Sequence, residues 1–449
     1  MYRFRNIVII IFFFLCMVSY AQDTWTLNKC ITYALDHNLK IHELKFNTAS
    51  SKESYQQSYR ELFPSISAGS NYDISYGRSV DPNNNQIVSS NFFSNNYSIN
   101  ADIDIFRGFQ KLNTIASTKF LYKATQEESL QEKYLLAFRV MTAFYDVKFY
   151  QGQLQITSEQ LEISSTNVNL VKRQIELGLK AGADLYEAKS VESGDKLAFI
   201  QNKNNLKAAK LKLVQEMNLN EQSDIEITTL DEAVALDTSY EKQMSTDSIY
   251  TNSLGFMPTI KSQEFRVHAA KKEISIARGA LYPSLSFSAG YGTGYFETNI
   301  DASGKVIPFR TQISDNASQF IGLSLRIPIS QRWSRRSEVK QQKIALLKAE
   351  NSLSLQKQEL NKIIQELIQN YQSTLAEYEQ TEQSVTSQAL AFKIAQKKYN
   401  RGMISLLELN QSKNLYAKAQ NDNLQVTLKL KVQKKTIDFY KGLPVFNIN

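Results

Sequence analysis

Two stretches of the chain run for more than a hundred residues without proline. The seven prolines leave residues 83–257 and 329–443 free of this residue, and the second stretch contains only two glycines, Gly402 and Gly442. Gln, Lys, Glu, Leu and Ala dominate both stretches and favour helix. This pattern predicts two long helices, over about 108–176 and 331–400, each roughly 100 Å long at ~1.5 Å per residue.

Apolar residues recur in both stretches at spacings of three and four. Tyr134, Phe138, Met141 and Tyr145 form one such series, and Leu360, Ile364, Leu367 and Tyr371 form another. A single apolar stripe of this kind is typical of helices that pack as coiled coils.

The chain also repeats itself. Leu62-Phe63-Pro64-Ser65 matches Leu281-Tyr282-Pro283-Ser284, and Gly178-Leu179-Lys180-Ala181 matches Gly402-Met403-Ile404-Ser405. Each half is therefore predicted to contain a helix, two strands, a long helix, a tight turn and a helix. The expected division is a first repeat over 22–235, an acidic, polar linker over 236–257, and a second repeat over 258–443.

Four segments alternate between apolar and polar residues over about ten positions, at 62–76, 92–106, 281–296 and 318–330. In the second of them, Tyr97, Ile99, Ala101, Ile103 and Ile105 alternate with polar residues. Such segments form either a half-exposed sheet covered by helices or a membrane barrel with a wet interior. Three features favour the barrel: a polar face nearly free of large apolar residues, Tyr and Phe at the strand ends, and long polar loops at 77–91 and 297–317.

Four strands cannot close a barrel, because about eight is the practical minimum. An open edge in lipid would leave backbone groups without hydrogen bonds. Several copies of the chain must therefore combine their strands, and three copies would give twelve strands and a lumen, although the residues alone leave the number open. The side chains expected to line this lumen, where solvated polarity would also explain them, are Asp73, Asp102, Asp104 and Arg326.

The first residues predict export from the cytoplasm. Arg3 and Arg5 precede an apolar run over 7–18, and Ser19-Tyr20-Ala21 supplies small residues for cleavage. This is the pattern of a signal peptide over 1–21, and the run is short for the alternative, a membrane anchor. The mature chain then has a single cysteine, Cys30, which is expected in the core rather than in a disulfide.

Several function classes lack support in the sequence. Basic residues are spread along the chain without a patch that also carries aromatics, so no nucleic acid is expected as a partner. The three histidines, His37, His42 and His268, do not have the spacing of a metal site, and no glycine-rich motif for phosphate is present. The chain is therefore not expected to be an enzyme or to need a cofactor.

The segment from Trp25 to Leu35 with Asn38, the duplicated Pro-Ser strand starts and the duplicated Gly turns together resemble the TolC-like outer membrane efflux protein family. The resemblance covers nearly the whole mature chain. It implies four β-strands per protomer in a homotrimeric, twelve-stranded outer-membrane β-barrel, continued by a long α-helical coiled-coil barrel in the periplasm of a Gram-negative bacterium. It also implies a passive exit duct surrounded by outer-membrane lipid and joined through a periplasmic adaptor (a membrane fusion protein) to an inner-membrane transporter of the RND, ABC or MFS type.

By this resemblance, the adaptor contacts Gly178-Leu179 and Gly402-Met403, and Asp184, Tyr399 and Glu408 lie at the tunnel constriction. The residues alone suggest helix capping instead, with Ser405–Glu408 and Asp184–Glu187 as capping boxes, and the two roles are compatible. The chain departs from the family where charged residues are expected, since it has Ile404, Gln411 and Thr427. We therefore hypothesise that the periplasmic end of the helices, at the two Gly turns, is held closed less tightly or by different contacts.

Two other functions fit the same features. One is a type I secretion duct that exports polypeptides, for which the chain would look the same. The other is a periplasmic coiled-coil scaffold that conducts nothing, and the polar strand faces argue against it because a scaffold needs no wet interior.

Overall fold

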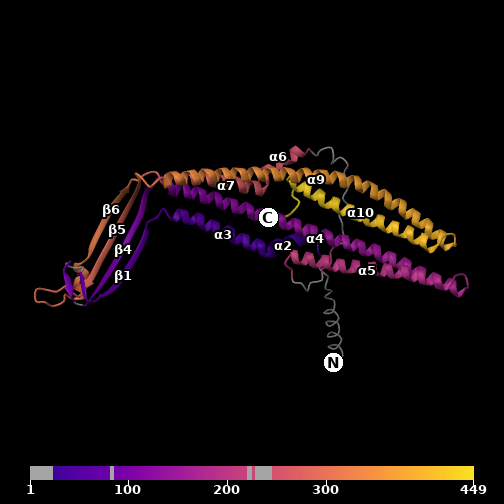
Figure 1. Ribbon diagram of the computed structural model, residues 1–449, viewed down its shortest axis with the longest axis horizontal. Helices are drawn as coiled ribbons and strands as arrows, with labels where there is room; N and C mark the ends of the chain where they lie inside the picture. Colours follow the sequence, from indigo (N-terminus) through magenta and orange to yellow (C-terminus); the bar gives the residue numbers. More distant parts are fainter. Residues whose placement is uncertain (1–23, 81–84, 90, 220–224, 228–244, 449) are drawn as a thin grey trace, which may run out of the picture. The chain divides into compact units, whose positions relative to one another are not determined.

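The computed structural model describes residues 24–80, 85–89, 91–219, 225–227 and 245–448 (Figure 1). The predicted signal peptide lies outside these residues. The chain forms two compact units: one from Met1–Leu44, Ser129–Met257 and Lys357–Asn449, the other from Lys45–Glu128 and Pro258–Gln356. Among the described residues, no helix is both long enough and apolar enough to cross a bilayer.

The two halves of the chain contain helices of equal length. The 11-residue helices are α2 (Leu27–His37) and α6 (Thr246–Phe256), and the 22-residue helices are α3 (Leu39–Arg60) and α7 (Pro258–Gly279). The 67-residue helices are α4 (Gln110–Glu176) and α9 (Ser334–Asn400), and the 35-residue helices are α5 (Gly182–Glu216) and α10 (Leu406–Tyr440). The predicted repeat and both long helices are confirmed, and the helix ends lie within three residues of the expected positions.

The predicted linker over 236–257 is wrong in its second part. Helix α6 lies there, and the hydroxyl of its N-cap Ser245 accepts a hydrogen bond from the Ser248 amide (3.4 Å). Met257 separates α6 from α7, because a residue before proline is disfavoured in helical conformation and Pro258 suits the first position of the next helix. In the first half, Asn38 separates α2 from α3, and its side chain accepts from the Lys40 amide (2.9 Å). Helix α6 has the same length as α2, so the second repeat includes Thr246–Phe256.

The four predicted strands form one antiparallel sheet in the order β1-β4-β5-β6 (Figure 1). Their bounds are β1 (Ser65–Ser75), β4 (Phe92–Arg107), β5 (Ser284–Phe296) and β6 (Ser318–Arg326). The central pair, β4 with β5, joins the two halves of the chain, and β1 and β6 form the outer edges. The last strand ends earlier than the predicted residue 330, since Pro328 has no amide hydrogen for the ladder.

Both loops that were predicted only as long and polar contain regular structure. The first includes the hairpin of β2 (Arg78–Val80) and β3 (Ile87–Ser89), and the second includes α8 (Phe309–Asp315). Gln312 of α8 is buried and accepts from the Phe296 amide (3.0 Å) while donating to the Ile307 carbonyl (2.8 Å). The buried amide therefore fixes α8 to the end of β5.

Cys30 lies in the core of the first unit, as predicted. It is fully buried, together with residues of α2, α4 and α5 that include Ala34, Leu136, Val140 and Leu213. Burial raises the pKa of the Cys30 thiol to about 12, because the apolar surroundings disfavour the thiolate.

We expect Cys30 to react with a maleimide at pH 8 about a thousandfold more slowly than an exposed thiol, because only the thiolate attacks. The rate is measured by mass spectrometry on protein that carries Cys16→Ser, before and after unfolding in guanidinium chloride. Fast labelling of the folded protein would show that α2 does not pack as described.

Candidate functional site

The four predicted lumen residues share one face of the sheet. Residues paired across strands lie on the same face, and so do alternate residues along one strand. The pairs that place them there are Asp73 with Ser94, Asp102 with Ser65 and Ser288, Asp104 with Ser286, and Arg326 with Ser284. This face is mostly serine, glycine and asparagine, as the alternation predicted.

Two features of the sheet differ from the prediction. The register shifts between Asp104 and Phe106, so Ile105 is an extra residue in a bulge rather than the last member of the apolar series. The polar face also carries an aromatic side chain, because Phe320 pairs with Gly290. A Cβ on Gly290 would lie 2.3 Å from Phe320 Cε1, so the glycine makes room for the ring.

Asp104 is paired with two cations at the junction between β4 and α4. Its carboxylate lies 3.3 Å from Arg107 Nη1 and 3.1 Å from Lys111 Nζ. These contacts connect the strand end to the first turn of the long helix.

The two tight turns between long helices have the same backbone structure. In the first turn, the Leu179 amide donates to Gln174 O (2.8 Å) and Gly178 has φ +74°. In the second, the Met403 amide donates to Lys398 O (2.9 Å) and Gly402 has φ +73°. This is the Schellman motif, whose left-handed position favours glycine, so the predicted role of both glycines as helix terminators is confirmed.

The Schellman motif alone does not mark a binding site. Asn218 after α5 and Gly442 after α10 end their helices in the same way. The turns at Gly178 and Gly402 each carry two large, exposed apolar side chains, which are Leu177, Leu179, Met403 and Leu407, whereas the Gly442 turn carries one, Leu443.

Asp184 and Glu408 occupy equivalent positions, each as the third residue of the helix after a turn. The Ala181 amide donates to the Asp184 carboxylate (3.1 Å), and the Glu408 amide donates to Ser405 Oγ (3.2 Å). The two turns thus contain complementary halves of a capping box. The predicted Asp184–Glu187 box is wrong, because the helix already begins at Gly182.

Tyr399 is buried at the end of α9 and contacts the other turn. Lys180 Nζ lies 3.5 Å from the Tyr399 hydroxyl and 5.1 Å from the centre of its ring. Ile404 packs against the same apolar cluster as Tyr399. Sequence reasoning missed Lys180, since nothing local predicts a contact between residues 219 positions apart.

A buried ion pair joins α5 to α10. Lys413 is fully buried, and its ammonium group contacts the carboxylate of Asp195, whose side chain is 18% exposed. Lys413 follows Leu406 and Leu409 on the buried face of α10. A charged residue on an apolar helix face was the available sequence signal for this pair.

The described part of the chain holds no group of three or more His, Cys, Asp or Glu side chains that is placed to bind a metal ion.

A family profile described as "Outer membrane efflux protein" matches residues 30–218 and 249–442, and the chain belongs to this family. Among curated relatives, the toluene efflux pump outer membrane protein TtgC of Pseudomonas putida is 23% identical over 296 residues, which is 62% of this chain and 57% of TtgC. Outer membrane protein TolC of Vibrio cholerae is 21% identical over 372 residues, covering 82% of this chain and 80% of TolC.

Solved structures share the fold. The outer membrane protein VceC of Vibrio cholerae aligns with a TM-score of 0.77 at 15% identity, over 93% of this chain and 96% of VceC. The CmeC outer membrane channel of Campylobacter jejuni aligns with a TM-score of 0.77 at 15% identity, over 95% of this chain and 90% of CmeC. The long helical hairpins and the four-stranded sheet are therefore the fold of outer membrane channels.

Proposed function

We propose that three copies of this chain form a passive exit duct in the outer membrane of a Gram-negative bacterium, as part of a tripartite efflux system. The observation that carries this proposal is the four-stranded sheet, which has one polar face and two outer edges. In lipid, edge strands need partners for their backbone groups. Pairing β6 of one protomer with β1 of the next would satisfy both edges and close a twelve-stranded wall.

The polar face of this wall would surround water. Asp73, Asp102, Asp104 and Arg326 would then line the lumen, with Asp104 held by Arg107 and Lys111. Serine and glycine fill most of the remaining positions on this face, which keeps the bore wide.

The two turns would dock a periplasmic adaptor, which in turn joins an inner-membrane transporter of the RND, ABC or MFS type. Exposed Leu179 and Met403, beside the rigid Gly178 and Gly402 positions, supply apolar contacts for such a partner. Asp184, Tyr399 and Glu408 would lie at the constriction.

The test of the duct is conductance of the purified protein in planar lipid bilayers. We expect discrete channels from an assembly whose mass equals three protomers. A folded protein that inserts but conducts nothing would support a scaffold instead, and a stable monomer would contradict the shared barrel.

The carboxylates at the turns are expected to make the channel prefer cations, because charged rings select counter-ions. Glu408→Ala should lower the ratio of cation to anion permeability, measured as the reversal potential in a salt gradient. Glu43→Ala is the matched control, since Glu43 forms an exposed pair with Lys40 (2.8 Å) on α3. An unchanged reversal potential in Glu408→Ala would argue against a constriction at this residue.

A further inference from the structure

The two junctions between a sheet strand and a long helix share an uncommon backbone conformation. Gly108 and Phe109 lie between β4 and α4 with φ values of 58° and 62°, and Arg332 and Trp333 lie between β6 and α9 with φ values of 50° and 64°. Left-handed φ values are unfavourable for residues with a Cβ atom. At both junctions the second residue is aromatic and exposed, at 62% for Phe109 and 72% for Trp333.

The two junctions differ in their charge. At the first, Asp104 pairs with both neighbouring cations, Arg107 and Lys111. In the second half of the chain, Pro328 occupies the position that corresponds to Asp104 in the first half. The second junction therefore lacks the acid that neutralises the first.

Three arginines at the second junction form no ion pair with an acidic side chain in the described part of the chain. They are Arg332, Arg335 and Arg336. The segment 326–340 carries five cationic residues and a single acid, Glu338, whose carboxylate accepts from Gln342 Nε2 (2.8 Å). Uncompensated positive charge is thus concentrated at the end of β6.

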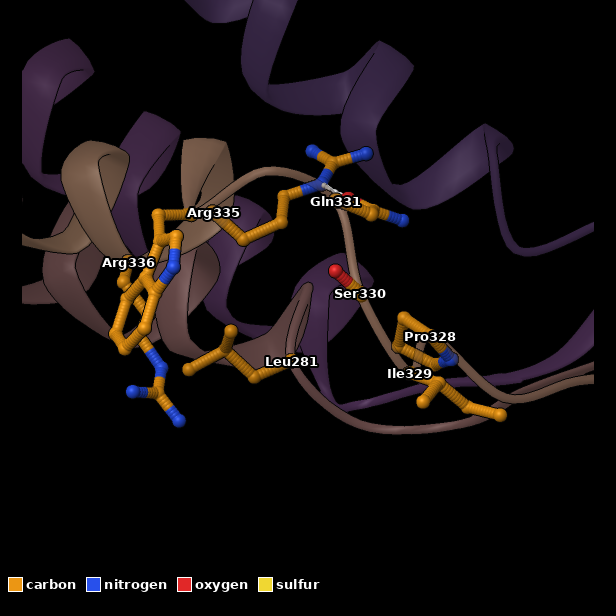
Figure 2. Close-up of a pocket in the computed structure, with 8 residues that line it drawn as sticks. Leu281, Pro328, Ile329, Ser330, Gln331, Arg335 and Arg336 are labelled. Atoms are coloured by element: carbon orange, nitrogen blue, oxygen red, sulfur yellow. Dashed lines mark hydrogen bonds between the residues drawn. The ribbon is translucent and has the colours of Figure 1, made fainter.

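A cavity of about 200 Å³ lies beside these arginines. Its walls are formed by Leu281, Pro328, Ile329, Ser330, Gln331, Trp333, Arg335 and Arg336. Figure 2 shows Leu281 between Arg336 on one side and Pro328 and Ile329 on the other. The volume has room for about seven water-sized groups, at ~30 Å³ each.

Two contacts hold the arginines at this cavity. The Arg336 guanidinium lies 4.4 Å from the centre of the Trp333 ring, and Arg335 Nε donates to Gln331 Oε1 (2.7 Å). The remaining guanidinium N–H groups can donate to an oxyanion, and arginine matches phosphate geometry well.

We infer that this cavity, which we call the junction pocket, binds the headgroup of an anionic glycerophospholipid. The inference rests on the proposed function, which places the strand in the outer membrane and the helix in the periplasm, so that the junction lies at the phospholipid leaflet facing the periplasm. Figure 2 shows the guanidinium groups of Arg335 and Arg336 on opposite sides of the pocket. Arg335 would bind the phosphate and Arg336 would add positive charge near it, while Trp333 and Ile329 would contact the start of the acyl chains.

The exposed apolar side chains favour a lipid over a free phosphate ion. In a single protomer, Ile329 is 95% exposed and Trp333 is 72% exposed, and both adjoin the arginines. Tryptophan and arginine side chains often lie at membrane–water interfaces, with the apolar part toward lipid and the polar part toward water. A phosphate ion alone would leave these apolar surfaces uncovered.

The test uses Trp333 fluorescence in the full chain, purified in a non-ionic detergent. The chain has two tryptophans, so Trp25→Phe leaves Trp333 as the reporter. Short-chain phosphatidylglycerol is titrated in, with phosphatidylcholine of the same chain length and inorganic phosphate as separate titrations. We expect a saturable change with phosphatidylglycerol, and a much weaker response to the other two.

Removing the two arginines with Arg335→Gln and Arg336→Gln should weaken phosphatidylglycerol binding about 25-fold, at about fivefold for each charge near an anionic surface. The lysine variants Arg335→Lys and Arg336→Lys, which keep the charge, should lose less than the glutamine variants. Arg107→Gln is the matched control at the first junction, where Lys111 still pairs with Asp104, and it should leave binding unchanged. Size-exclusion chromatography verifies that each variant assembles as the parent protein does.

Four results would overturn the lipid site. They are no response of Trp333 to any lipid, equal binding of phosphatidylcholine, saturation by inorganic phosphate at the same concentration, and equal weakening by Arg107→Gln. Conductance of the same preparation separates this inference from the proposed function. A channel that conducts but does not bind phosphatidylglycerol would reject the junction pocket and leave the exit duct intact.

Discussion

Asp195→Asn is expected to destabilise the protein by about 3–5 kcal/mol, because it leaves the ammonium group of Lys413 buried without a negative charge beside it. Lys413 is fully buried on α10, so water cannot replace the lost carboxylate. The measurement is urea unfolding followed by circular dichroism, at one protomer concentration for all variants, since the stability of an assembly depends on concentration.

Two variants distinguish a lost partner from a general packing defect. Lys413→Met combined with Asp195→Leu removes both charges and should return to within about 1 kcal/mol of the parent protein. Lys212→Met is the matched control: Lys212 pairs with Asp146 at 2.9 Å, but these side chains are 56% and 42% exposed. It should cost ~0–1 kcal/mol, as exposed pairs do. Equal losses in Asp195→Asn and Lys212→Met would show that the Lys413 site is open to water.

Gly108→Ala is expected to cost about 2–5 kcal/mol, from overpacking and from a left-handed backbone that alanine tolerates poorly. A Cβ at this position would lie 2.2 Å from the carbonyl oxygen of Gly279, the last residue of α7. Backbone atoms cannot rotate away as a flexible side chain can, so α7 or the start of α4 must shift. Urea unfolding and the yield of assembled protein measure the effect.

Gly178→Ala is the control that measures the cost of the left-handed backbone without overpacking. Gly178 has φ +74°, and no heavy atom lies within 4 Å of the place that the alanine methyl group would occupy. Its substitution should therefore cost only ~1 kcal/mol. If both alanine variants lose the same stability, the close approach of Gly108 to Gly279 is not the source of the effect.

The fold was predictable where it depends on local patterns. Long stretches without proline, spaced apolar residues and glycine turns determine helices by interactions within a few residues, so α4 and α9 were found within three residues of their ends. The alternation of side chains likewise located the four strands. Strand alternation also placed Asp73, Asp102, Asp104 and Arg326 on one face.

The remainder depends on residues that are distant in the sequence. Ile105 leaves the apolar series because the register between β4 and β5 shifts at this residue. A pattern of alternation in one strand cannot reveal such a bulge. The contact of Lys180 with Tyr399 and the pair of Lys413 with Asp195 exist only after two helical hairpins pack together. Helix α6 was missed because the acidic, polar composition before residue 258 resembles a linker.

The matched lengths of the helices constrain how a chain of this kind can gain or lose residues. A deletion in α4 alone would leave its 67-residue counterpart α9 longer, and the turn at Gly178 would then end at a different level from the turn at Gly402. A viable change in length would have to occur in both halves, and in α5 and α10 by the same number of turns. Insertions and deletions in relatives should therefore come in coordinated sets, and a single-site insertion in one long helix should be tolerated far less than one in a strand-connecting loop.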